Sequence, residues 1–248
     1  MVEGEWPYNP RDMAVTDSER ALTRARGIDR GRLETRRLRE ELKSLRTGVM
    51  CALNMLLDLK DLRTGLHATR LAEWAVRVGE NLGVDELELR DIEAASLLHD
   101  IGKIGLPDSI LLKPGKLTPE EYAITKKHPE YGWAILRSIP GFERTSLLVL
   151  HHHERYDGRG YPAGLAGQDI PLGSRIVAIV DSFDAMLSSR AYRDALPVEE
   201  AVRRLTADTG TQFDPRIAPL FIDLARAQLP ELLDGADDLP VGLAKILP

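Results

Sequence analysis

The sequence is poor in cysteine and lacks long apolar runs. Its 248 residues include a single cysteine, Cys51. No disulfide can therefore form within the chain, and a reducing compartment is expected. No stretch approaches the roughly 18 uninterrupted apolar residues that indicate a membrane-spanning helix. Residues 1–20 are charged and have no apolar centre, unlike a signal peptide. We therefore expect a cytoplasmic protein without a membrane span.

A surplus of positive charge is also absent. The chain has 33 Lys and Arg against 39 Asp and Glu, a formal net charge of −6. Binding to a nucleic-acid polymer requires many clustered cations, so this class of partner is not expected. A small anionic ligand remains compatible with the charge. The 43% of hydrophobic residues suffices for a packed core and argues against global disorder.

The charge is unevenly distributed along the chain. Residues 20–46 carry ten Lys or Arg and four Asp or Glu, a local net charge of +6, so the remainder carries −12. From this basic segment onward, apolar residues recur at alternating spacings of four and three, as in a coiled coil or a helix packed along another. These seam residues are Leu38, Leu42, Leu45, Val49, Ala52, Leu56 and Leu59. Two interpretations stay open: a helix that caps the main core, and a helix that forms a homodimer.

Helical patterns continue after residue 61, and no stretch alternates with period two for long enough to indicate a sheet. Gly83 is typical of a helix C-terminus, and Thr118-Pro119-Glu120-Glu121 is typical of a helix start. We expect an all-α fold, with a basic N-terminal segment at 1–47, a helical domain at 48–230 and a C-terminal tail at 231–248. The expected helices cover residues 66–82, 85–99, 118–138, 142–154, 175–188, 198–208 and 214–228.

Histidines and carboxylates are concentrated in the part of the chain that should form this domain. All six histidines lie between residues 67 and 153, and Asp181 and Asp184 follow on a later helix. Neutral imidazoles combined with carboxylates are the ligand set of Zn²⁺, Fe or Mn sites. A carboxylate next to a histidine can also give one oxygen to each of two metals. The candidates are His67, His99, Asp100, His128, the run His151-His152-His153, and Asp181.

Each candidate also has a structural explanation. A lone histidine is more often a satisfied core or surface residue, Asp100 could cap the segment that follows it, and a triple histidine could be a solvated surface. However, Asp181 directly follows the apolar run 176–180, where a buried carboxylate would be costly unless it were compensated. The clustering of these histidines and carboxylates, together with the position of Asp181 after an apolar run, therefore favours a metal site. Residues 151–153 lie in the helix expected over 142–154, so their side chains point about 100° apart and at most two adjacent ones can share one site. This geometry does not decide which two.

Two strings of residues carry a recognisable pattern. His99-Asp100-Ile101-Gly102-Lys103 and the string from His152-His153-Glu154 to Gly160-Tyr161-Pro162 resemble the HD-GYP family of cyclic di-GMP phosphodiesterases. The resemblance covers about residues 61–221. It implies that residues 48–230 form an HD-GYP catalytic domain, an all-helical HD-domain bundle preceded by an amphipathic N-terminal helix. Further matching motifs are Leu112 to Thr118, His128-Pro129, Ile170-Pro171-Leu172, Asp181 to Ala185 and Phe213-Asp214-Pro215.

The resemblance also implies a pair of metals. His67, His99, Asp100 and Asp181 would hold one metal, and Asp100 would bridge to a second metal held by His128, His152 and His153. His151 would then point outward. Fe or Mn is favoured, while Zn, Ni or Mg is compatible with the ligand set. Some family members carry a Glu four residues before the first histidine that contributes to a third metal. Arg63 stands there in this chain and cannot be a ligand, so two metals are expected.

The implied activity is hydrolysis of cyclic di-GMP to linear pGpG, and further to GMP, in bacterial second-messenger signalling. Asp100 and Lys103 would act in catalysis, and Lys103, Tyr161, Arg190 and Arg193 would contact the substrate. The Gly160-Tyr161-Pro162 region could instead dock a GGDEF-type or adaptor protein. Two alternatives stay open: a hydrolase of another cyclic dinucleotide or nucleotide ester, and a catalytically weak protein that binds cyclic di-GMP as a scaffold.

Overall fold

A computed structural model describes the backbone of residues 17–61, 66–188 and 195–227, and the side chains of residues 32–60, 68–188 and 195–227. The chain divides into two units, residues 1–49 and residues 50–248. Within the described ranges the regular structure is helical, with one isolated bridge between Thr209 and Phe213 and no strand. The prediction of an all-α fold is confirmed. None of the helices in these ranges has the length and hydropathy needed to cross a membrane.

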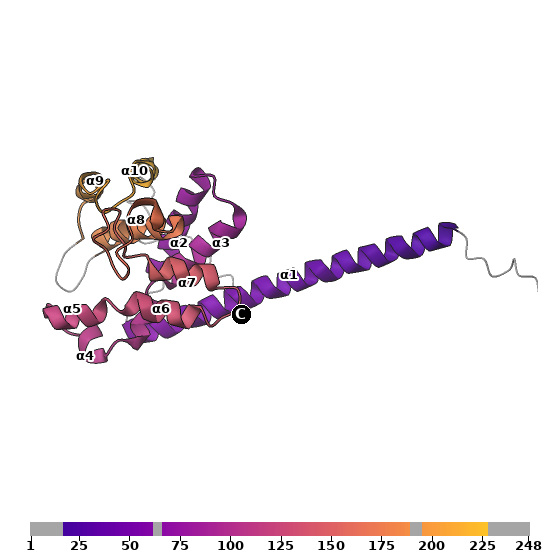
Figure 1. Ribbon diagram of the computed structural model, residues 1–248, viewed down its shortest axis with the longest axis horizontal. Coiled ribbons are helices and arrows are strands. Elements are labelled where there is room, and N and C mark those ends of the chain that lie inside the picture. Colours follow the sequence, from indigo (N-terminus) through magenta and orange to yellow (C-terminus); the bar gives the residue numbers. More distant parts are fainter. Residues whose placement is uncertain (1–16, 62–65, 189–194, 228–248) are drawn as a thin grey trace, which may run out of the picture. The chain divides into compact units, whose positions relative to one another are not determined.

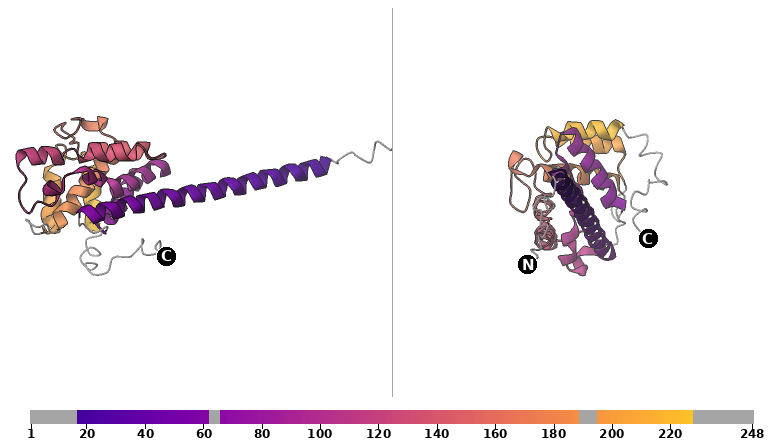
Figure 2. Two further views of the ribbon diagram at one scale, coloured as in Figure 1. Left: turned by 90° about the horizontal axis from the view of Figure 1, so that it is seen from below. Right: turned by 90° about the vertical axis from the view of Figure 1, so that its right-hand side faces the viewer.

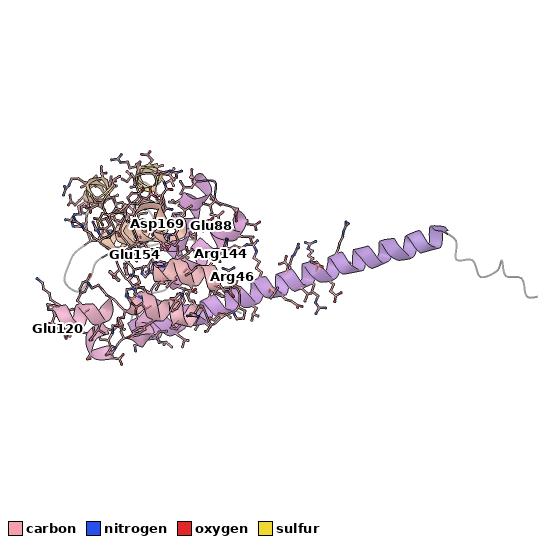
Figure 3. All side chains as sticks on the ribbon, viewed as in Figure 1. Arg46, Glu88, Glu120, Arg144, Glu154 and Asp169 are labelled. Carbon is pink, nitrogen blue, oxygen red and sulfur yellow. The ribbon has the colours of Figure 1, made fainter. Side chains whose placement is uncertain are left out.

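The first unit contains most of α1 (Asp17–Asp61). Arginine and leucine dominate this helix, and both have high helix propensity. An ion pair one turn apart, from Arg37 Nε to Glu41 Oε1 at 2.8 Å, adds to its stability. The side chains of residues 32–45 are exposed to solvent (Figure 3). Leu38, Leu42 and Leu45 of the seam remain 53–65% exposed, so they are not core residues of this unit.

The last turns of α1 belong to the second unit and contact it through a different face from the seam. Leu57 is buried there, and Lys60 Nζ donates a hydrogen bond to the carbonyl oxygen of Ile104 at 2.9 Å. The seam residues Leu56 and Leu59 stay exposed. The end of α1 therefore packs on the main core, as the capping interpretation expects, but the contacting residues do not belong to the seam.

Three helices form the centre of the second unit: α2 (Leu66–Asn81), α3 (Glu86–Leu98) and α8 (Leu172–Leu187). Each packs against the other two, and fully buried aliphatic side chains fill the space between them. α10 (Ile217–Ala227) adds Phe221, whose ring makes edge contacts with Trp74 at 5.7 Å and with Phe183 at 5.2 Å between centroids. These aromatic contacts fix α10 against α2 and α8.

The remaining helices complete the domain. α9 (Val198–Ala207) pairs with α10 on the side of the domain away from α4 (Asp108–Leu111) and α5 (Pro119–Thr125) (Figures 1 and 2). α6 (His128–Leu136) packs on α7 (Glu143–Leu150) and on the 3₁₀ helix η2 (Ile101–Gly105). A second 3₁₀ helix, η3 (Gly167–Asp169), lies in the loop before α8.

Several predicted helix boundaries are wrong. The helix expected over residues 118–138 is two helices, α5 and α6. The cause is Pro129, which has no N–H to donate and whose ring would clash with the carbonyl of Thr125 in a continuous helix. The start expected at residue 214 is also wrong, because α10 begins at Ile217. The expected connector 102–115 contains η2 and α4.

The helix expected over residues 142–154 ends early, at Leu150. Residues 151–153 form a turn, closed by a hydrogen bond from the amide of Glu154 to the carbonyl oxygen of His151 at 3.0 Å. The helical spacing assumed for the three histidines is therefore wrong. A turn can direct the adjacent rings of His152 and His153 to one place.

Gly102 sits where two backbones touch. A Cβ atom at this position would lie 1.8 Å from the carbonyl oxygen of His128 and 2.4 Å from the amide nitrogen of Gly132. Since both obstacles are backbone atoms of α6, no side-chain rotation could relieve the clash. The glycine thus allows η2 to contact α6 directly and brings Asp100 and Lys103 close to His128.

We predict that Gly102→Ala destabilises the domain by at least ~2 kcal/mol, because overpacking against backbone forces η2 away from α6. Denaturant unfolding of the two proteins measures this difference. Gly115→Ala is the matched control, since nothing lies within 4 Å of a Cβ at that position. Equal stability of Gly102→Ala and Gly115→Ala would contradict the proposed close contact.

Candidate metal centre

Three histidines converge in the described part of the second unit. His128 is the first residue of α6, and His152 and His153 lie in the turn after α7. The Nε2 atom of His128 is 3.4 Å from Nε2 of His152 and 3.2 Å from Nε2 of His153. One potential ligand atom from each residue lies within 4.8 Å of the other two. Such convergence of ring nitrogens is typical of a metal site.

Backbone carbonyls orient the rings. Nδ1 of His128 lies 2.8 Å from the carbonyl oxygen of Thr125, and Nδ1 of His152 lies 2.6 Å from that of Val149. His99 has the same arrangement, with Nδ1 2.8 Å from the carbonyl oxygen of Ser96. A carbonyl accepts only from a protonated nitrogen, so these contacts place the proton on Nδ1 and leave the Nε2 lone pair for the centre.

Asp100 lies between two groups of histidines. Its Oδ1 is 3.5 Å from Nε2 of His128, and its Oδ2 is 3.3 Å from Nε2 of His99. Nε2 of His99 is in turn 3.7 Å from Oδ1 of Asp181 on α8. The carboxylate thus offers one oxygen to each side, which is the arrangement a bridging ligand requires.

The carboxylates make the His99 side of the centre strongly cation-binding. Burial of His99 opposes its protonation, but the charges of Asp100 and Asp181 and a hydrogen bond to Asp100 outweigh burial and raise the pKa of His99 to about 9. Burial likewise opposes ionisation of Asp100. Lys103, His99 and His128 overcome it and hold the pKa of Asp100 well below its usual value. The negative charges of Asp100 and Asp181 that hold a proton on His99 also favour the binding of a metal cation there.

The three converging histidines, His128, His152 and His153, are kept neutral. Burial, together with the neighbouring imidazoles, lowers the pKa of His152 well below 6.5 and that of His153 to about 4. Burial also lowers the pKa of His128. Metals bind neutral imidazole, so this environment keeps the ligands in the form that coordination needs. The donor set therefore fits divalent metal ions.

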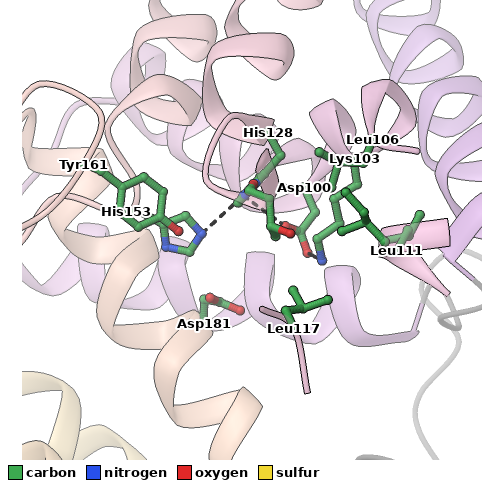
Figure 4. A pocket seen from close by; sticks show the side chains of 11 residues that line it. Asp100, Lys103, Leu106, Leu111, Leu117, His128, His153, Tyr161 and Asp181 are labelled. Carbon is green, nitrogen blue, oxygen red and sulfur yellow. Dashed lines mark hydrogen bonds and ion pairs between the residues drawn. The ribbon is translucent and has the colours of Figure 1, made fainter. Parts of the chain in front are cut away.

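A cavity of about 340 Å³ opens onto the centre (Figure 4). Its polar end is formed by Asp100, Lys103, His128, His153 and Asp181, and its other wall is apolar. Nζ of Lys103 is 2.5 Å from Oδ2 of Asp100 and faces this space. The volume lies within the range of small-molecule sites. The apolar wall, which the sequence did not reveal, consists of Leu106, Ile110, Leu111 and Leu117.

Tyr161 forms part of the same cavity. Its ring lies 4.9 Å from that of His153 between centroids, and its amide donates to the carbonyl oxygen of His153 at 3.2 Å. Burial raises the pKa of Tyr161 above its usual value, so the phenol stays protonated and can donate a hydrogen bond. Gly160 permits this fold-back, because a Cβ there would lie 2.3 Å from the amide nitrogen of Arg155.

Glu154 holds the Tyr161 loop in place, a role that sequence reasoning missed. Its buried carboxylate accepts hydrogen bonds from the amides of Ala163 at 2.7 Å and Gly164 at 3.1 Å. Nδ1 of His151 lies 3.5 Å from the same carboxylate oxygen. His151 therefore faces Glu154 with only 13% of its side chain exposed, so the expectation that it points outward is wrong. An acidic residue directly after the histidine pair was the available signal.

A second contact missed in the sequence joins the helices that carry His67 and Asp181. Arg70 on α2 forms an ion pair with the buried carboxylate of Asp184 on α8. Each partner lies three residues beyond one of the predicted ligands, so the pair fixes the two helices near the centre. The side chain of His67 lies outside the described residues, as do Arg63, Arg190 and Arg193.

Comparison with known proteins identifies the family of the chain. The HD domain family model matches residues 52–217, and the chain belongs to this family, whose phosphohydrolases are metal-dependent. The resemblance to HD-GYP phosphodiesterases is confirmed. A cyclic di-GMP phosphodiesterase of Thermotoga maritima is 43% identical over 180 residues, which cover 72% of this chain and 49% of that protein.

Two further relatives come from Vibrio cholerae. A 3′3′-cGAMP-specific phosphodiesterase 2 is 40% identical over 182 residues, covering 70% of this chain and 35% of that protein. The structure of a cyclic GMP-AMP-specific phosphodiesterase aligns with a TM-score of 0.59 at 20% identity, covering 80% of this chain and 52% of the other. At this low identity, the similarity to the solved structure shows a shared fold and nothing further. The chain thus matches about half or less of the length of these curated relatives.

We predict that the metal-stripped protein is most stable near pH 6.5. The pKa of His99 is raised from 6.5 to about 9, so its contribution is complete below pH 6.5 and is lost as the pH rises through 9. The loss is about 1.4 kcal/mol per pH unit for one proton. The pKa values of His128, His152 and His153 are lowered in the folded protein. Below pH 6.5 the unfolded chain therefore binds more protons than the folded protein, and stability falls as the pH falls.

Denaturant unfolding in a chelator at several pH values measures this profile. His99→Gln should remove the decline between pH 6.5 and 9 and leave the acid-side decline in place. A metal-stripped protein whose stability rises steadily from pH 6.5 to 9 would contradict this electrostatic account.

Proposed function

We propose that the chain is a metal-dependent phosphodiesterase that hydrolyses cyclic di-GMP to linear pGpG, with GMP as the product of a second cleavage. The observation that carries this proposal is the convergence of Asp100, the neutral histidines and Lys103 at the polar end of one cavity. The identity of the chain to cyclic di-GMP phosphodiesterases supports the choice of substrate.

Two divalent metal ions are the proposed cofactors, with Fe or Mn favoured and Zn, Ni or Mg compatible. His67, His99 and Asp181 would hold one ion, and His128, His152 and His153 the other, with Asp100 contributing one oxygen to each. Bound in this way, divalent metal ions supply Lewis acidity at the phosphodiester and lower the pKa of a water molecule. The opposite-facing oxygens of Asp100 support a pair over a single ion.

The remaining residues of the cavity would bind and orient the substrate. Lys103 presents a cation beside Asp100, where it would stabilise the negative charge that develops on the phosphoryl oxygens. Tyr161 would donate a hydrogen bond from its protonated phenol. The apolar wall would exclude water from the ribose and base next to the cleaved bond. Arg190 and Arg193 remain proposed contacts to the phosphates and bases.

A 3′3′-linked GMP-AMP cyclic dinucleotide is the second candidate substrate. The 40% identity to a phosphodiesterase specific for 3′3′-cGAMP favours it. The apolar wall does not select between guanine and adenine, because both bases are planar and the leucine and isoleucine side chains make no directional hydrogen bonds. A protein that binds cyclic di-GMP without cleaving it is disfavoured by the number of donors that converge in the described part of the centre.

The domain bounds, location, biological role and oligomeric state of the chain are proposed as well. We propose residues 48–230 as the catalytic domain, a cytoplasmic location, a role in bacterial second-messenger signalling, and a homodimer formed through α1. Docking of a GGDEF-type or adaptor protein at Gly160-Tyr161-Pro162 is a further proposal. The position of Tyr161 in the cavity lining favours substrate contact over docking for this one side chain.

We predict that Asp100→Asn lowers kcat for cyclic di-GMP at least ~1000-fold, because a neutral amide cannot join two cations and removal of this charge costs several kcal/mol of transition-state stabilisation. Asp169→Asn, at an exposed loop carboxylate, is the matched control and should retain activity. The assay uses Mn²⁺ or Fe²⁺ with cyclic di-GMP and 3′3′-cGAMP in parallel. Binding of cyclic di-GMP without turnover by the unmodified protein would overturn the proposal. A much higher kcat/KM for 3′3′-cGAMP would establish the second candidate.

We predict two metal ions per chain after anaerobic purification, since Arg63 offers no ligand for a third. Elemental analysis against protein concentration gives the ratio. Arg63→Glu restores a carboxylate at this position and tests whether a third ion can then bind. Three ions per chain in the unmodified protein would contradict the two-metal proposal.

A further inference from the structure

A row of large apolar side chains on α1 is exposed to solvent. Leu38, Leu42, Leu45, Leu56 and Leu59 are between 53% and 80% exposed, although they follow a strict spacing of four and three. In heptad notation Leu42, Val49 and Leu56 occupy the a positions, and Leu38, Leu45, Ala52 and Leu59 occupy the d positions. The pattern covers three heptads, enough to indicate a coiled coil when charges flank it. Leu57 and Lys60, which contact the second unit, lie outside this seam.

The flanking charges follow the same heptads. Glu34 and Glu41 occupy successive g positions, and Arg39 and Arg46 occupy successive e positions. Each glutamate precedes an arginine by five residues, which is the separation of the g and e′ positions that meet across a parallel coiled coil. Glu34 would thus meet Arg39 of a second copy, and Glu41 would meet Arg46.

The signs of these charges select one arrangement. In a parallel pair of identical helices, every one of these contacts joins a glutamate to an arginine. In an antiparallel pair, g meets g′ and e meets e′, so glutamates would oppose glutamates and arginines would oppose arginines. Val49, a β-branched residue at an a position, is of the type that favours two strands.

We infer that the seam of α1 binds the seam of a second copy of this chain, in a parallel and in-register two-stranded coiled coil. The apolar row supplies the buried contact, and Glu34, Glu41, Arg39 and Arg46 set its direction and register. Glu41 also forms an intrahelical ion pair with Arg37, but this pair competes only weakly with the contact to Arg46 of the second copy. Both side chains are exposed, and such pairs contribute little to stability. The inference sharpens the proposed homodimer and is independent of the reaction catalysed.

Charge reversal tests the pairing. Glu34→Lys with Glu41→Lys should weaken dimerisation at least ~10-fold at low ionic strength, and Arg39→Glu with Arg46→Glu should weaken it similarly. Sedimentation equilibrium of the full chain measures both effects. A mixture of the two variants should form heterodimers, because opposite charges then meet again. The chain carrying all four substitutions should recover homodimerisation, which an antiparallel pair would not predict.

Cysteine cross-linking tests direction and register. In a Cys51→Ser background, Leu45→Cys places a thiol at a d position, where in-register parallel copies bring it next to its counterpart. Oxidation should yield a covalent dimer. Thr47→Cys, at the outward f position, is the matched control and should not cross-link.

A monomeric unmodified chain would overturn the inference, as would equal cross-linking at residues 45 and 47. Unchanged dimerisation after Glu34→Lys with Glu41→Lys would also overturn it, since antiparallel copies do not depend on the sign of these residues. None of these measurements depends on catalysis, so an inactive chain would leave the inference standing.

Discussion

The arrangement of the domain depends on one buried carboxylate. Asp100 lies within 3.5 Å of ring nitrogens on two sides, and the ammonium of Lys103 lies 2.5 Å from one of its oxygens. A buried carboxylate is tolerated only where such partners offset the loss of hydration. The surrounding cations keep it ionised against the effect of burial. Its charge in turn raises the proton affinity of His99, so the two groups define a place where positive charge is stabilised.

The fold brings these groups together from distant parts of the chain. Asp100 follows the end of α3, His128 begins α6, His152 and His153 lie in the turn after α7, and Asp181 lies on α8. Local contacts fix each piece: backbone carbonyls orient the rings, Gly102 allows η2 to touch α6, and Glu154 holds the loop of Tyr161. The cavity beside them combines a charged end with an apolar wall, which suits a ligand that carries both a phosphodiester and planar bases.

The sequence predicted the helical class and the positions that gather at the centre, because both leave local signals. The capping box at Thr118 is present, and Gly83 adopts a positive φ at the end of α2 as its C-cap position predicts. The capping box and the apolar pattern alone predict one continuous helix over residues 118–138, whereas Pro129 breaks it into α5 and α6. The early end of α7 has no equally local signal. Glu154, four residues beyond the end of α7, accepts hydrogen bonds from amides nine and ten residues away, a tertiary contact that periodicity cannot reveal. The ion pair of Arg70 and Asp184 and the apolar wall are likewise products of packing.

We propose that Asp100 joins two metal ions, one on each side of its carboxylate. Anomalous diffraction at the absorption edge of the metal, from crystals grown with Mn²⁺ or Fe²⁺, locates the ions relative to this carboxylate. We expect two peaks about 3.5–4 Å apart, one beside His128, His152 and His153 and the other beside His99 and Asp181, with an oxygen of Asp100 near each. A single peak, or two peaks that do not share Asp100, would contradict the account.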